Sequence, residues 1–311
     1  MYTVYPDYYP DFKCIADKCR HNCCIGWEID IDQKTAEYYK NLPGEIGENI
    51  RRNIDWTDTP HFKLAEHDRC PMLDSRGLCT IMLNLGTDCV CDICAEHPRF
   101  YNELDDHIEC GLGLSCEAVC DLIINNKNTV KLIGYTDIVK QSPDIQFRDH
   151  IIELLQDRSK SIRHRISYAL SACSISSFDP DIRAWTDILA GLERLSDEWT
   201  GVLSDLKAYH TPEAAAVFDG YMQDRTAEYE QLAVYIIYRY MIRSDITAQE
   251  ACLFAAFTYC IIRAAGAAIF AKKGSFTRAD QLDIIRMYSA EIEYSTDNLY
   301  IILDALNEEY Q

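Results

Sequence analysis

The sequence predicts a mainly α-helical protein: a loop-rich, cysteine-dense region with a few short strands, packed on a helical carboxyl-terminal region. Three observations lead to this fold class. Twelve of the 15 cysteines lie within the first 120 residues of the 311-residue chain. Turn-forming residues interrupt the same part of the chain at short intervals. Beyond it, apolar residues recur at spacings of three and four, the pattern of a helix that buries one face.

The first region is assigned to residues 1–125. Its clearest extended segment is 27–32, where Ile29 and Ile31 alternate with acidic residues. Apolar periodicity is otherwise too short for a conventional core, so a bound metal is expected to supply much of the order. Turns are predicted at residues 42–44, 74–77 and 111–113.

The second region, residues 126–311, is predicted to be helical. It is expected to pack with the first region as one body, since no repeat, low-complexity tract or Gly/Ser linker separates them. Thr211, Pro212 and Glu213 follow the preferred order of a helix start. The predicted helices span residues 146–160, 180–207, 212–243, 247–271, 277–293 and 296–309.

One apolar segment, residues 251–271, is long enough to cross a bilayer. Arg263 lies near its middle and opposes insertion into a membrane. Thr247 and Glu250 form a capping box, which is typical of a helix start in a folded domain. We therefore predict a buried helix and no membrane partner.

Composition and charge narrow the class of protein further. A formal net charge of −20 argues against a nucleic-acid partner, because phosphate binding requires clustered Lys and Arg. The amino terminus has neither a basic start nor an apolar run, so no secretory signal is expected. We therefore expect a cytoplasmic protein. In that reducing compartment, dense cysteine indicates a metal site rather than disulfides.

The cysteines form a compact cluster within residues 14–24 and a dispersed group within residues 70–120. A zinc ribbon needs two C-x2-C pairs, whereas this chain has one, at Cys91 and Cys94. The three-cysteine pattern of common radical S-adenosylmethionine enzymes is missing, because Gly26 stands where the third cysteine would be. Zinc and iron–sulfur centres both accept thiolate ligands, so the spacing leaves both open.

Four blocks of the chain resemble the flagellin lysine N-methylase family, and they occur in the family's order. The blocks are residues 12–27, 70–79, 94–99 and 114–116. His97 stands where the family usually has Tyr or Phe. The resemblance covers about residues 12–125, and residues 126–311 show only a general likeness in helical character.

The resemblance implies a protein lysine N-methyltransferase that uses S-adenosylmethionine to methylate flagellin or another lysine-bearing protein. It also implies an iron–sulfur cluster, expected to be 4Fe-4S, with zinc as the alternative. More cysteines match the blocks than one cluster needs, so either some of them are not ligands or there are two centres. We expect three ligands from the first block and the remainder from later blocks. The candidate metal ligands are Cys14, Cys19, Cys23, Cys24, Cys70, Cys79, Cys94 and Cys116.

Two residues within these blocks, Trp27 and Arg99, are candidates for cofactor binding. The structural alternatives are that Trp27 shields the metal from water and that Arg99 forms an ion pair. The turn at 111–113 lacks the third glycine of a Rossmann motif, so we interpret it as a turn that leads to Cys116.

The residues identify no catalytic base. The chain has 20 tyrosines, concentrated at 2–9 and 229–240, and most are expected to pack at the edge of the core. A second hypothesis therefore stays open, namely a metal-stabilised structural, binding or redox module without methyl transfer.

Overall fold

The computed structural model describes residues 2–136 and 142–310 and confirms a mainly α-helical fold with a few short strands. The chain forms two compact units. The small unit is Lys13–Phe100, and the large unit combines Met1–Phe12 with Tyr101–Gln311. The expectation that two regions of the chain pack as one body stays a prediction.

The small unit has an apolar core of its own, although its sequence shows little periodicity. Ile29 and Ile31 are buried, as their alternation predicts. Residues 27–32 are nevertheless an extended loop. The Ile31 amide of this loop donates a hydrogen bond to the Pro60 carbonyl of a neighbouring segment (2.7 Å). The core stayed hidden in the sequence because loops and short elements each contribute one or two of its members. The regular elements are α1 (Gln33–Asn41), α2 (Gly44–Arg52), β2 (Ile54–Asp55), β3 (His61–Phe62), α3 (Thr80–Leu85) and α4 (Asp92–Glu96).

A four-stranded sheet explains why the boundary between the units falls near residue 100 and not near residue 125. Its order is β4-β5-β1-β6, with β1 parallel to β5 and antiparallel to β6. Val4 lies opposite Glu109, so the amino terminus is joined to the large unit by strand pairing. The change in composition along the chain reflects where the cysteines lie, whereas the extent of each compact unit is set by these long-range strand pairs. The strands are β1 (Tyr2–Pro6), β4 (Arg99–Glu103), β5 (His107–Leu112) and β6 (Leu132–Ile133).

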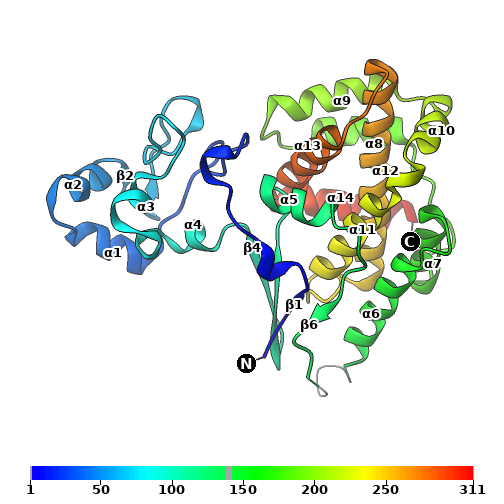
Figure 1. Cartoon of the computed structure of the whole chain (residues 1–311), viewed down its shortest axis with the longest axis horizontal. Helices are drawn as coiled ribbons and strands as arrows, with labels where there is room; N and C mark the ends of the chain where they lie inside the picture. Colours follow the sequence, from blue (N-terminus) through cyan, green and yellow to red (C-terminus); the bar gives the residue numbers. More distant parts are fainter. Residues whose placement is uncertain (1, 137–141, 311) are drawn as a thin grey trace. The chain divides into compact units, whose positions relative to one another are not determined.

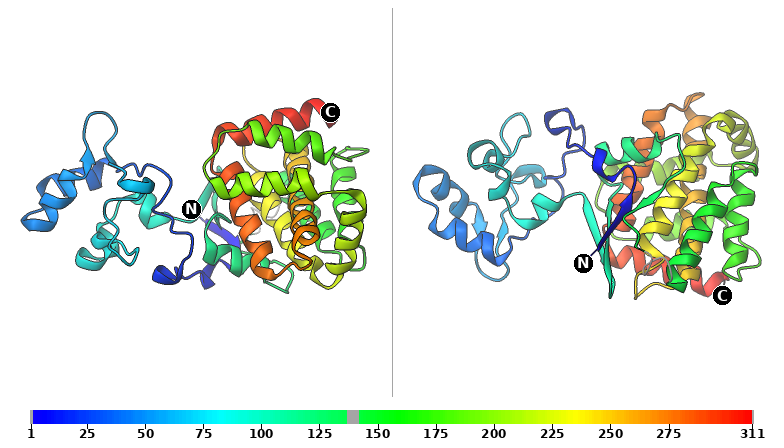
Figure 2. Two further views of the ribbon diagram at one scale, coloured as in Figure 1. Left: turned by 90° about the horizontal axis from the view of Figure 1, so that it is seen from above. Right: turned by 60° about the horizontal axis from the view of Figure 1, so that its bottom comes forward.

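The helices of the large unit gather around α12, as Figures 1 and 2 show. Helix α12 contacts α7, α8, α9, α10, α11, α13 and α14. The helices are α5 (Glu117–Ile124), α6 (Pro143–Gln156), α7 (Ile162–Ala172), α8 (Ile182–Gly191), α9 (Asp197–Tyr209), α10 (Pro212–Tyr221), α11 (Thr226–Tyr240), α12 (Ala248–Lys273), α13 (Arg278–Tyr288), a π-helix (Ser289–Glu293) and α14 (Thr296–Tyr310).

Among the residues that the structure describes, one helix, α12, is long and apolar enough to cross a membrane. In the fold, 83% of its apolar stretch is buried. Arg263 is satisfied there by Asp219, with 2.5 Å between Nε and Oδ1. The prediction of a buried core helix is therefore confirmed. The helix begins at the predicted capping box and ends at Gly274, whose φ of +73° suits a glycine.

Replacing Thr247 by alanine is expected to lower the free energy of unfolding by about 1 kcal/mol. Thr247 Oγ1 accepts a bond from the Glu250 amide (3.2 Å), and the Glu250 carboxylate accepts one from the Thr247 amide (2.6 Å). The change removes the first bond and loosens the second. Urea unfolding followed by circular dichroism measures the effect; an unchanged midpoint would mean that the box adds no stability.

Two predicted helices are each interrupted in the structure. The segment 180–207 forms α8 and α9, because the Glu291 carboxylate accepts bonds from the Leu195 amide (2.9 Å) and the Ser196 hydroxyl (2.8 Å). The segment 212–243 likewise forms α10 and α11. Helix α7 was not predicted, although Ser161 caps its start.

Of the predicted turns, the one at 74–77 is confirmed by a bond from the Gly77 amide to the Asp74 carbonyl (3.0 Å). Gly44 adopts a φ of +80° where the turn at 42–44 meets α2. The third turn lies later than predicted, because residues 111–112 still belong to β5. It leads to Cys116 and α5, as expected.

Candidate metal centre

Three loops of the small unit are tied together around their cysteines. The Cys70 amide donates to the Cys24 carbonyl (2.8 Å), which joins the second cysteine block to the first. The Asn22 side chain strengthens this join, since it donates to the Gly77 carbonyl (2.7 Å) and accepts from the Cys24 amide (2.9 Å). The third loop is held by Asp32, whose carboxylate accepts from the amide of Asp92 at the start of α4 (2.9 Å).

The segment 70–79 folds back on itself and brings both of its cysteines to the same loops. The Asp74 carboxylate accepts from the amides of Arg76 (2.8 Å) and Leu78 (3.0 Å). Leu73 and Cys79 then pair in an antiparallel bridge. The aspartate and the glycine of this turn are therefore the local reason why Cys70 and Cys79 belong to one loop.

Six thiols of the small unit influence one another electrostatically. Cys91 and Cys94 lie 3.4 Å apart, sulfur to sulfur, on the first turn of α4. A hydrogen bond from Cys24 lowers the pKa of Cys23 to about 7. The pKa of Cys24 is raised by that same bond, by burial, and then by the charges of Cys23, Cys70 and Cys79.

The pKa values of Cys70 and Cys94 are also raised by neighbouring thiols. Burial raises the pKa of Cys70 to about 11, and Cys79, Cys91 and Cys23 contribute to the rise. The pKa of Cys94 is raised first by its bond with Cys91, then by burial and by the nearby sulfurs of Cys91 and two further cysteines. The full set is Cys23, Cys24, Cys70, Cys79, Cys91 and Cys94.

Neighbouring thiolates repel one another, and a thiophilic cation removes that repulsion when it binds them. The donor set of these six cysteines therefore suits a thiolate-binding metal in its chemistry. Within residues 2–136 and 142–310, no group of three or more His, Cys, Asp or Glu side chains is already arranged to hold a metal ion. The donors are thus gathered in one neighbourhood without being assembled around one point.

The structure places the predicted ligands in three ways. Five of them belong to the set of six: Cys23, Cys24, Cys70, Cys79 and Cys94. Cys14 and Cys19 bond to nearby backbone, to the Ala16 amide (3.4 Å) and the His21 carbonyl (3.2 Å) respectively. Cys116 belongs to the large unit, where it directly precedes α5.

Cys91 is a member of the set that the family blocks leave out. The signal for it was present in the sequence, because Cys91 and Cys94 form the C-x2-C pair of the chain. Cys89 lies near the same set: its sulfur is 3.5 Å from the Tyr38 hydroxyl, and its carbonyl accepts a bond from Tyr39 (2.7 Å).

The two candidate cofactor residues differ in how closely they approach the cysteines. The Trp27 indole donates to the Cys23 carbonyl (2.7 Å), so this side chain braces the double-cysteine loop while 37% of it stays exposed. Arg99 is the first residue of β4 and is half-buried. His97 is partly buried, and desolvation lowers its pKa; its Nε2 atom has no hydrogen-bond partner in the described chain. Its neutral imidazole therefore keeps one nitrogen available.

The large unit contains a separate buried polar network, on α11 and the π-helix. The hydroxyls of Tyr235 and Tyr240 both donate to Glu293 Oε2, at 2.9 and 3.0 Å. The Arg239 guanidinium lies over the rings of Tyr240 (5.4 Å) and Tyr294 (5.1 Å), and its Nη1 is 3.4 Å from Glu293. A carboxylate, a cation and aromatic rings thus stabilise one another here. The tyrosine-rich stretch 229–240 was the sequence signal for this network.

The carboxyl-terminal part of the chain is the part that matches a known protein family. Residues 179–311, which contain this network, match the FliB lysine N-methylase C-terminal domain. This part of the chain is similar to the C-terminal domain of the FliB lysine N-methylases. The resemblance seen in the sequence is thereby confirmed, and it reaches into a region where only helical character was expected.

Three relatives show how far the similarity extends. The Lysine-N-methylases of Salmonella choleraesuis (strain SC-B67) and Salmonella typhimurium (strain LT2) are each 26% identical over 147 residues, which is 44% of this chain and 36% of the relative. The flagellar biosynthetic protein FliU of Salmonella muenchen is 26% identical over 137 residues, 41% of this chain and 79% of FliU. The alignment thus spans about a third of each Lysine-N-methylase. No solved structure matches the chain.

Proposed function

We propose that this chain is a protein lysine N-methyltransferase. The observation that carries the proposal is the match of residues 179–311 to the FliB lysine N-methylase C-terminal domain. Two relatives that bear the name Lysine-N-methylase support it. In such a transfer, a neutral lysine ε-amine attacks the methyl carbon of S-adenosylmethionine. The carbon–sulfur bond breaks, a carbon–nitrogen bond forms, and the amine releases one proton.

Flagellin is the proposed acceptor protein, and the cytoplasm is the proposed location. A relative named for flagellar biosynthesis, FliU, supports the flagellar connection. The charge of this chain fits as well, because a net charge of −20 attracts a lysine-bearing surface and speeds its approach. The same chemistry applies to any other lysine-bearing protein, and the labelling experiment below distinguishes flagellin from other acceptors.

The small unit is the proposed site of a 4Fe-4S cluster. Its ligands would come from Cys23, Cys24, Cys70, Cys79, Cys91 and Cys94, whose coupled thiols support this assignment. When bound, the cluster would cross-link the three loops that carry these cysteines. The chain's own bonds, from Cys70 to Cys24 and from Asp92 to Asp32, already hold these loops near one another.

Methyl transfer is tested with the full chain purified without oxygen, methyl-labelled S-adenosylmethionine and purified flagellin. We expect label on flagellin lysines, located by peptide mass spectrometry. Flagellin whose lysines have been acetylated is the matched control and should take up none.

Two other outcomes are informative. Label on another protein, with none on flagellin, would keep the methyltransferase and replace its acceptor. If the metal-loaded chain labels no lysine in flagellin or in a lysate of its own host, the proposed activity is wrong.

A further inference from the structure

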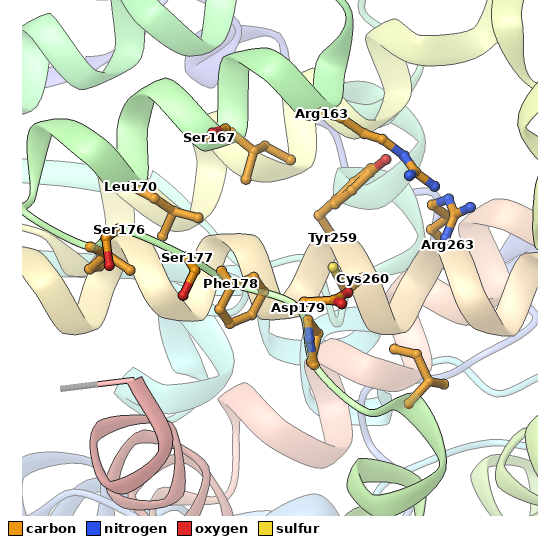
Figure 3. A pocket seen from close by; sticks show the side chains of 14 residues that line it. Arg163, Ser167, Leu170, Ser176, Ser177, Phe178, Asp179, Tyr259, Cys260 and Arg263 are labelled. Atoms are coloured by element: carbon orange, nitrogen blue, oxygen red, sulfur yellow. The ribbon is translucent and has the colours of Figure 1, made fainter. Parts of the chain in front are cut away.

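Two adjoining cavities lie between the helices of the large unit. The smaller has a volume of about 250 Å³ and the larger about 500 Å³. Both are lined by Arg163 of α7 and Tyr259 of α12, so one wall is common to them. Figure 3 shows the smaller cavity, where the guanidinium groups of Arg163 and Arg263 point toward one another beside the hydroxyl end of Tyr259. The larger cavity is of the size that small-molecule sites have in other proteins.

One carboxylate of the larger cavity, Asp219, is shared by two arginines. It accepts from Arg163 (2.8 Å to Oδ2) and from Arg263 (2.5 Å to Oδ1 and 2.7 Å to Oδ2). One carboxylate neutralises only one guanidinium, so this group of three keeps one net positive charge.

A second carboxylate, Glu230, repeats the arrangement in the larger cavity. It accepts from Arg158 (2.7 Å) and from Arg165 (2.5 Å), and its side chain is fully buried. Lys160 and Asp224 also line this cavity and carry opposite charges. The larger cavity is therefore positive within a chain whose net charge is −20.

Two residues that line the larger cavity each carry an enclosed polar atom without a hydrogen-bond partner in the described chain. These atoms are the Tyr229 hydroxyl and Arg165 Nε. Tyr229 and Arg165 are each 3% exposed. A buried donor without a partner costs about 1–3 kcal/mol, a cost that a bound acceptor removes. The Tyr229 ring meets the Tyr259 ring edge to face at 5.3 Å, which gives the cavity an aromatic wall.

We propose that the larger cavity binds a small organic anion. Its carboxylate or phosphate group accepts hydrogen bonds from Tyr229 and Arg165, and its planar or apolar body lies against the two tyrosine rings. The positive charge of the arginine groups selects for the anion, and the unpartnered donors fix its position. This site does not depend on methyl transfer, so either proposal can fail without the other.

Titration calorimetry on the full chain at low salt tests the site with three probes. S-adenosylhomocysteine carries a carboxylate, adenosine monophosphate carries a phosphate, and adenosine carries neither. We expect at least one of the two anions to bind, and adenosine to bind at least about tenfold more weakly than that anion. Which anion binds identifies the source of the negative group. Absence of binding by both anions would overturn the proposal.

The decisive variant is Tyr229→Phe, which removes only the unpartnered hydroxyl. We expect it to weaken the bound anion by about tenfold, while the melting temperature without ligand stays the same or rises. The matched control is Tyr288→Phe on α13, because that buried hydroxyl shares a hydrogen bond with Thr258 (3.0 Å). The control should lose stability and keep its affinity for the anion. Unchanged affinity in Tyr229→Phe would also overturn the proposal.

Discussion

Replacing Arg148 by methionine is expected to lower the free energy of unfolding by about 3–5 kcal/mol, because it leaves a buried carboxylate without its partner. Arg148 Nη1 lies 2.7 Å from both oxygens of Glu109, and both side chains are fully buried. This pair joins β5 to α6, so its loss removes one of the bonds between the sheet and the helices. Urea unfolding of the full chain, followed by circular dichroism, measures the change.

Two further variants separate the ion pair from a general effect of losing an arginine. Arg76→Met breaks an exposed pair with Asp74 and should cost less than about 1 kcal/mol. Glu109→Gln combined with Arg148→Met removes both charges and should be more stable than Arg148→Met alone. If Arg148→Met costs no more than Arg76→Met, the buried pair is not what holds the sheet to α6.

Replacing Cys24 by serine is expected to remove most of the bound metal and to give poorly soluble protein. Cys24 bonds to Cys23 and interacts with Cys70 and Cys94, so its loss affects all three loops. Iron and zinc per chain, measured by mass spectrometry of the acid-digested protein, report the effect. Cys260→Ser on α12 is the control and should keep the metal, since Cys260 belongs to the large unit.

A second pair of variants distinguishes the structure from the family pattern. Cys91→Ser should lose metal, because Cys91 lies 3.4 Å from Cys94. Cys14→Ser should keep more of it, because the Cys14 sulfur bonds to the amide of Ala16 only two residues away. The reverse result, with metal lost from Cys14→Ser and kept in Cys91→Ser, would contradict the set of six thiols.

Local signals were the part of the fold that the sequence could predict. Helix α12 was expected to begin at Thr247 and to be buried, and both are confirmed, because the capping box and the apolar run lie within a few residues of one another. The break between α8 and α9 was missed, since it depends on Glu291, which is about a hundred positions away in the chain. The extent of the large unit depends on long-range pairing as well, because β1 pairs with β5 more than a hundred residues later in the chain.

The candidate sites also differ in how far the sequence could predict them. Most of the gathered cysteines were predicted, because short blocks of sequence carry them. The buried arginine groups were not, because Arg158, Arg165 and Glu230 come from separate segments and meet only in the folded chain. Helical periodicity identifies which positions are buried, but it does not show which charged residues are buried beside each other.

The central proposal is that the six neighbouring thiols of the small unit hold an iron–sulfur centre. Its most direct test is the iron and acid-labile sulfide content, with the visible absorbance, of the full chain purified without oxygen. We predict about four iron and four sulfide per chain and the broad visible absorbance of thiolate-bound iron. Stoichiometric zinc with neither iron nor sulfide would contradict the claim and leave a zinc site in its place.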